Sequence, residues 1–228
     1  MKPTTTVAVL TGDLIGSRRL SEPQRQQLFR ELNGYWHQYA PSLLDSSPCD
    51  IQVYRGDGWQ ALVPKPEQAV NAAIFIRAAI KALNVVDGMD TRLGVGVGRV
   101  DSLNPAKLGD FNGPAFIRSG EALDSLVTPG PAWAFNHSQL KFQNIFLATC
   151  PIMDLAIQRW TKAESAAVVG SLLGLTQEEI AKHPLACKDD GDAPTRQAIS
   201  DALKRIGWSS HWQPTLKHIK SQLAQASS

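Results

Sequence analysis

Two spacings of hydrophobic residues alternate along the first 150 positions of the chain. Short, nearly continuous apolar runs indicate buried strands, whereas stretches with an apolar residue every three or four positions indicate helices. Strand-like runs lie at 7–13 (VAVLTGD), on both sides of the Gly-Asp-Gly in 53–63 (VYRGDGWQALV), and at 91–100 (TRLGVGVGRV). Helix-like stretches lie at 23–39 and 67–83. The predicted order is therefore β-α-β-β-α-β.

This order predicts an α+β fold with a split βαβ, or ferredoxin-like, sheet. We expect a further helix at 113–126, an irregular segment rich in Pro and Gly after it, and a short strand at 143–149 (QNIFLAT). The second helix-like stretch has Arg77 as a polar exception on its apolar face. Residues 1–150 are thus predicted to form one domain.

The strand pattern stops near Met153. Helix-like segments follow at 153–174, 176–182, 193–207 and 216–226, which together resemble a helix-turn-helix unit and predict a helical domain over 151–228. Thr176 is a candidate N-cap for the second segment, and Asp192 or Thr195 for the third. Trp208 and Trp212 are expected to anchor the last helix.

Composition indicates a globular protein in the cytoplasm. The 228 residues are 43% hydrophobic and 19% charged, and no run approaches the roughly 18 apolar residues of a membrane span. The short apolar run near the N-terminus ends in Asp13 and does not have the form of a signal peptide. Cys49, Cys150 and Cys187 form no CxxC pair, which disfavours a disulfide framework and a zinc site. A net charge of +2 is too small to indicate a nucleic-acid binder.

The candidate chemistry lies in two aspartates at strand ends. Asp13 closes the first strand, and Asp57 lies in the predicted hairpin. Two adjacent carboxylates repel each other unless a cation neutralises them, and Mg²⁺ combines carboxylate with phosphate oxygens. The pair predicts a Mg²⁺ site for a nucleoside triphosphate. The phosphates of the nucleotide are expected near residues 15–18, where Arg18, Arg19 or Arg55 would add positive charge. The alternative is that Asp13 caps the next turn and Asp57 only occupies a hairpin.

Four short motifs stand in the order found in class III nucleotidyl cyclases: DLIG (13–16), RGDGW (55–59), GVGVG (94–98) and DFNG (110–113). The chain resembles the palm domain of that class, and palms of this kind pair, which implies a homodimer. The resemblance implies Asp13 and Asp57 as metal ligands, and Asp110 as a base-selecting residue or a simple helix cap. The predicted nucleotide- or phosphate-binding residues are Leu14, Ile15, Gly16, Ser17, Arg18, Arg55, Asp110 and Arg118.

GVGVG continues as a strand and therefore differs from the dinucleotide-binding G-x-G-x-x-G, which opens a helix. Glycines inside a strand allow another backbone or a ligand to approach closely. We expect such an approach at 94–98.

The chain departs from active cyclases at three positions. Ile117 and Glu121 stand where the resembled class has its transition-state Asn and Arg, and Val53 stands in place of its purine-selecting Lys. An isoleucine donates no hydrogen bond, and a glutamate repels developing negative charge. The palm is therefore expected to bind a nucleotide for regulation. The alternative is a divergent nucleotidyl cyclase or transferase in which Arg118 compensates.

Over nearly its full length the chain resembles the SatD family, which joins such a palm to a C-terminal helix-turn-helix. The resemblance implies DNA binding and transcription regulation. Segment 151–228 has nearly equal numbers of basic and acidic residues, so docking to a protein partner is the alternative. The candidate DNA-binding residues are Arg196, Gln197, Ser200, Lys204 and Arg205.

Overall fold

The computed structural model describes residues 5–44, 50–54, 56–100, 113–187 and 192–227. The first part contains β1 (Thr5–Ile15), α1 (Glu22–Leu44), β2 (Gln52–Tyr54), β3 (Gly58–Val63), α2 (Ala69–Leu83), β4 (Asp90–Val100), α3 (Pro114–Asp124) and β5 (Trp133–His137). The second contains α4 (Leu140–Gln158), α5 (Lys162–Leu172), α6 (Gln177–Ala181), α7 (Arg196–Arg205) and α8 (Gln213–Ser227). Short helical turns are η1 (Ser17–Arg19), η2 (Pro66–Gln68), η4 (Pro184–Ala186) and η5 (Trp208–Trp212).

The strands form one five-stranded mixed sheet with the order β2-β3-β1-β4-β5. Neighbouring strands are antiparallel except β4 and β5, which are parallel. The long strand β1 lies at the centre and pairs with β3 on one side and with β4 on the other. The α+β class predicted from the hydrophobic pattern is confirmed.

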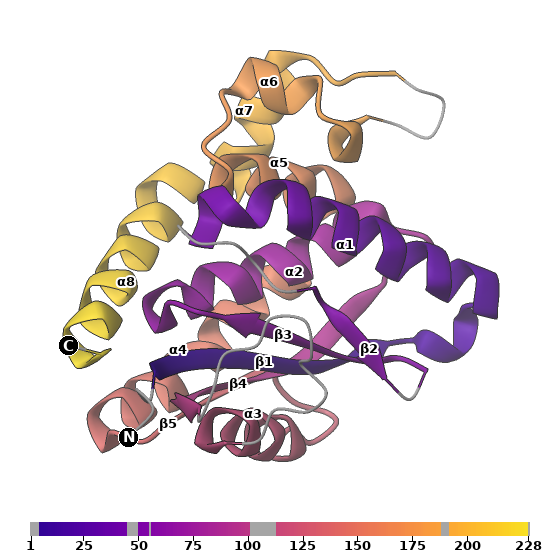
Figure 1. Ribbon diagram of the computed structural model, residues 1–228. Helices are drawn as coiled ribbons and strands as arrows, with labels where there is room; N and C mark the ends of the chain where they lie inside the picture. The colour runs from indigo at the N-terminus through magenta and orange to yellow at the C-terminus, as the bar shows by residue number, and fades with distance from the viewer. Residues whose placement is uncertain (1–4, 45–49, 55, 101–112, 188–191, 228) are drawn as a thin grey trace.

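Helices cover both faces of the sheet (Figure 1). Side chains of β1 alternate between the faces, as a pleated strand requires. Ala8 and Leu10 belong to the large core cluster shared with α1 and α2, whereas Val7 and Val9 belong to a smaller cluster beside α3. Asp13 has the same parity as Val7 and Val9, so the register places it on the α3 face.

The glycines of β4 allow α3 to lie directly on the sheet. A Cβ atom added to Gly94 would lie 2.3 Å from the backbone nitrogen of Leu123, and one added to Gly96 would lie 2.3 Å from that of Ser119. The expected close approach at GVGVG is confirmed, and the approaching backbone is that of α3.

Helix α2 is buried on nearly every side, with the sheet below it and α5 packed above it. The same core cluster continues through Trp160 and Trp208 to Leu223 of α8, where the Trp160 and Trp212 rings meet edge to face at 5.0 Å. The predicted anchoring of the last helix by tryptophans agrees with this packing. The expected domain boundary after residue 150 falls inside α4.

Three of the predictions of secondary structure were wrong. The strand expected at 143–149 is part of α4, because Phe142, Phe146, Cys150 and Met153 recur at helical spacing and all face the core. The single helix expected at 153–174 is two helices. Thr161 and Glu164 form a capping box that starts α5 anew. The segment expected to be irregular contains β5.

Arg77, the polar exception on α2, is the centre of a buried ion cluster. Its guanidinium donates to both carboxylate oxygens of Asp90 at 3.1 and 2.7 Å, and to Asp154 on α4 at 2.6 Å. Burial opposes the charge, but the two aspartates together raise the pKa of Arg77 above its ordinary value. The cluster therefore joins α2, β4 and α4 through a charged arginine.

No helix in the described part of the chain is both long enough and apolar enough to cross a bilayer. Cys150 is buried under β5, where burial, with Asp154 nearby, raises the pKa of its thiol to about 12. Cys187 is half-buried with a free thiol, and Cys49 lies outside the described residues.

Candidate functional site

Asp13 and Asp57 lie at the same end of the sheet. Asp13 on β1 pairs with Gly58 on β3, and Gly58 is the residue that follows Asp57. Both aspartates line one cleft of about 750 Å³. The predicted phosphate-binding residues Leu14, Ile15, Gly16, Ser17 and Arg18 line the same cleft, whereas Arg55 and Asp110 lie outside the described residues.

The position of Asp13 follows from the packing of Trp59. A Cβ atom on Gly12 would lie 2.5 Å from the Trp59 ring, so glycine is required for the indole to cross β1. The indole N–H donates to Thr91 Oγ1 at 2.9 Å, and that hydroxyl donates to the carbonyl oxygen of Asp13 at 2.6 Å. This buried chain fixes the backbone from which the Asp13 carboxylate projects.

Arg92 is a residue of the cleft that the sequence motifs did not identify. It lies opposite Asp13 on β4 and donates to both of its carboxylate oxygens, at 2.9 and 2.5 Å. These hydrogen bonds, followed by the charges of Asp13 and Asp57, raise the pKa of Arg92 above its ordinary value. Arg92 therefore supplies positive charge beside Asp13, which offsets the repulsion between the two carboxylates.

The turn after β1 forms one wall. Gly16 has a φ of 79°, a left-handed conformation that favours glycine, and the short turn η1 begins directly after it. Arg18 lines the cleft. Arg19 instead donates to the carbonyl oxygen of Asp87 at 2.8 Å, so its guanidinium holds the turn against the loop before β4.

The opposite wall consists of residues 127–132 and Gln158. Asp154 accepts the backbone N–H of Ala132 at 3.0 Å and the Gln158 amide at 2.6 Å. Because Asp154 also binds Arg77, this wall is connected to the buried ion cluster. The cleft thus has a wall whose position depends on buried charges.

The residues present fit a magnesium ion that arrives with a phosphate. Among the described residues, no three His, Cys, Asp or Glu side chains gather into a ready metal cage. Mg²⁺ usually needs only one or two carboxylates when phosphate oxygens and water complete its shell. Asp13 and Asp57 supply those carboxylates, and Arg18 and Arg92 supply cations suited to phosphate oxygens.

Arg118 lies elsewhere. It lines a separate cavity and donates to the carbonyl oxygen of Val97 at 2.9 Å. Val97 is five positions along β4 from Arg92, which at about 3.3 Å per residue is roughly 17 Å. The structure therefore does not bring Arg118 to the two aspartates. Ile117 is 62% exposed, and Glu121 accepts a hydrogen bond from Asn136 on β5.

The candidate DNA-binding residues all lie on α7, which Thr195 caps as expected. Arg196, Gln197, Lys204 and Arg205 are exposed. Arg205 donates to Glu164 of α5 at 2.9 Å, and Gln197 donates to Asp201 at 2.9 Å. Ser200, the remaining candidate, is half-buried. The accessible positive charge is small, and DNA binding stays a prediction.

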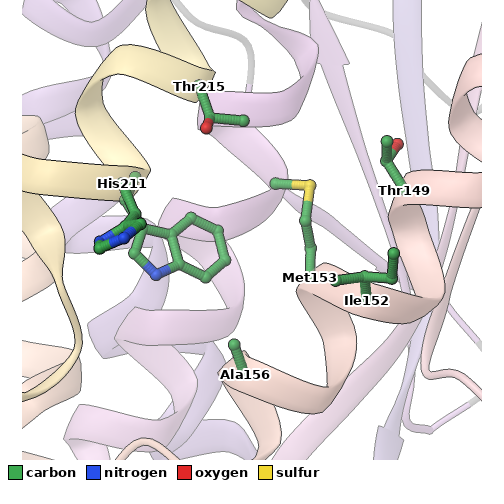
Figure 2. Close-up of a pocket in the computed structure, with 7 residues that line it drawn as sticks. Thr149, Ile152, Met153, Ala156, His211 and Thr215 are labelled. Carbon is green, nitrogen blue, oxygen red and sulfur yellow. The ribbon is translucent and has the colours of Figure 1, made fainter.

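An apolar pocket of about 280 Å³ lies between α4 and the start of α8. Figure 2 shows Met153 and Ile152 on one side and His211 and Thr215 on the other. The described residues that form its walls include no carboxylate, arginine or lysine. The cleft at Asp13 is therefore the stronger candidate, because it is larger and several charged side chains line it.

Comparison of the chain with family models found no match, and comparison with curated proteins found none either.

Proposed function

We propose that the protein is a nucleotide-binding regulatory protein whose cleft at Asp13 and Asp57 holds a nucleoside triphosphate with Mg²⁺. One observation carries the proposal: the two carboxylates, Arg18 and Arg92 line a single cleft of about 750 Å³. Two carboxylates beside two arginines suit a ligand that is itself a metal-bound polyphosphate, because each charge of the ligand then has a counter-charge.

The strand order supports a ferredoxin-like interpretation of the sheet. The four strands β2-β3-β1-β4 alternate in direction, as the split βαβ arrangement requires, and β5 extends them. In this arrangement the end of β1 and the β2–β3 hairpin lie at one edge. A palm of this kind presents Asp13 and Asp57 together to a ligand.

Arg92 has a defined part in the proposal. Arg92 neutralises Asp13 through two hydrogen bonds. When a nucleotide binds, its phosphate oxygens compete for the guanidinium, and Asp13 becomes available to Mg²⁺. The arginine thereby couples phosphate binding to metal binding.

The experiment is a calorimetric titration of ATP and GTP into the full chain, with Mg²⁺ or with EDTA. We expect binding that depends on Mg²⁺, and Asp57→Asn should weaken it at least about 10-fold, since loss even of an outer-sphere partner of a metal costs that much. Asp124→Asn, which removes an exposed carboxylate on α3, is the matched control and should bind like the wild type.

Two further results decide between regulator and enzyme. Product analysis of the same samples should show no cyclic nucleotide, because each missing transition-state donor costs about 10²- to 10³-fold in rate. Rapid cyclisation would favour the divergent enzyme instead. Equal affinity in Asp57→Asn and the wild type would mean that Asp57 only occupies a hairpin, and the proposed site would be abandoned.

A further inference from the structure

A second polar cavity, of about 350 Å³, lies at the opposite end of β4 from the aspartates. Its size is within the range of small-molecule sites. The polar side chains that line it come from β1, β4, α3, β5 and the turn after β5: Thr6, Arg99, Arg118, His137, Ser138 and Gln139. No carboxylate lines it within the described part of the chain.

The topology of the sheet favours a ligand at this point. β4 and β5 are the parallel pair, and the cavity lies at their carboxyl ends, beside Val97 and His137. The chain leaves β4 for α3 on one face of the sheet and leaves β5 for α4 on the other. In open α/β sheets, ligands bind in the crevice at the carboxyl ends of parallel strands where successive helices take opposite faces, and within this mixed sheet the β4–β5 pair has that local arrangement.

The positive charges of this cavity come from Arg99 and Arg118. Arg118 donates one N–H to the carbonyl oxygen of Val97, and this hydrogen bond fixes its guanidinium. A guanidinium has five N–H donors, and that bond uses one of them. Among the residues that the structure describes, neither Arg99 nor Arg118 forms an ion pair with a carboxylate. Two guanidiniums on one small cavity, with no carboxylate beside them in the described part of the chain, are suited to an anion.

His137 adds a donor rather than a further charge. Its Nδ1 accepts the backbone N–H of Gln139 at 3.0 Å, so the neutral ring carries its hydrogen on Nε2. Burial, and then the charge of Arg118, lower the pKa of His137 below its ordinary value. At neutral pH the ring is therefore uncharged and still able to donate to an anion.

We infer that this cavity binds a phosphate group, either inorganic phosphate or the phosphate of a small monoester, through Arg99, Arg118 and the hydroxyl of Ser138. Phosphate matches the guanidinium fork, and it accepts from hydroxyl and imidazole donors at the same time. The site is separate from the aspartate cleft, and phosphate binds there without a metal ion.

Calorimetric titration with EDTA present tests the site, because chelation removes the metal-dependent binding proposed for the cleft. The probes are sodium phosphate and a nucleoside monophosphate. We expect saturable binding that Arg99→Gln and Arg118→Gln each weaken about 10-fold or more, the effect of losing one charge-assisted hydrogen bond. Arg30→Gln, which changes an exposed arginine of α1, should bind like the wild type.

Ser138→Ala keeps the test valid if Arg118→Gln fails to fold, since Ser138 is exposed and its hydroxyl has no packing role. It should also weaken binding. Tighter binding of the monophosphate identifies a monoester as the ligand, and equal binding identifies free phosphate. Absence of saturable binding at millimolar concentrations, or loss of binding in Asp57→Asn, would overturn the inference, because the latter would locate the phosphate in the cleft.

Discussion

Replacement of Arg77 by methionine is expected to lower the free energy of unfolding by about 3–5 kcal/mol. The Arg77 side chain is fully buried and holds two carboxylates, Asp90 and Asp154, that are themselves almost inaccessible. Without the guanidinium both carboxylates remain buried, and among the described residues the cation left beside them is Lys81, 3.9 Å from Asp90. This shortage of positive charge is what makes loss of one member of a buried ion cluster costly. Urea unfolding at neutral pH measures the loss.

The controls separate charge from packing. Arg30→Met changes an exposed arginine and should alter stability by less than about 0.5 kcal/mol. Adding Asp90→Asn and Asp154→Asn to Arg77→Met should recover part of the stability, because the buried charges are then gone. A loss below about 1 kcal/mol for Arg77→Met alone would show that the cluster is hydrated or rearranges.

Substitution of Gly96 by alanine is expected to cost about 1–3 kcal/mol, the range typical of overpacked cores. The added Cβ would lie 2.3 Å from the carbonyl oxygen of Ala115 and from the amide nitrogen of Ser119, and both of these are backbone atoms of α3. A backbone cannot turn aside as a side chain does, so the whole helix must move away from β4. Chemical denaturation gives the cost, and amide chemical shifts of α3 report the displacement.

Gly120→Ala on α3 is the matched control for this substitution. A Cβ at Gly120 would meet no atom within 4 Å, and alanine is favoured over glycine inside a helix by about 0.5–1 kcal/mol. The same chemical change should therefore stabilise the protein at 120 and destabilise it at 96. Similar effects at both positions would refute the close packing of α3 on the glycines of β4.

Local patterns predicted much of the fold, because helices and strands of the first part bury one face at a regular spacing. α1, α2, α3 and β4 follow the ranges that this spacing indicates. β5 was missed since it has only five residues and follows a segment rich in Pro and Gly. Residues 143–149 were mistaken for a strand because a short apolar window does not distinguish the two periods, whereas the full length of α4 does.

Some residues of the candidate site could likewise be predicted from local sequence patterns, and others could not. Asp13, Asp57 and the turn at 14–18 carry local signals, namely glycines beside charged residues at strand ends. Arg92 has no such signal, because its partner Asp13 is brought to it only by the antiparallel register of β1 and β4. Arg77 was visible as an exception on an apolar helix, but its two aspartates are distant in sequence, and no spacing rule connects them.

The burial of α2 has a consequence for the way the chain folds during synthesis. The sheet covers one side of this helix, and α5 covers another. On the ribosome, strands β1 to β4 and α2 are complete well before residues 162–172 emerge. The apolar side of α2 that packs against α5 is therefore uncovered during that interval. Such exposed apolar surface is where nascent chains associate wrongly or recruit chaperones. Native packing of α2 is therefore completed only late in translation, when the C-terminal helices arrive.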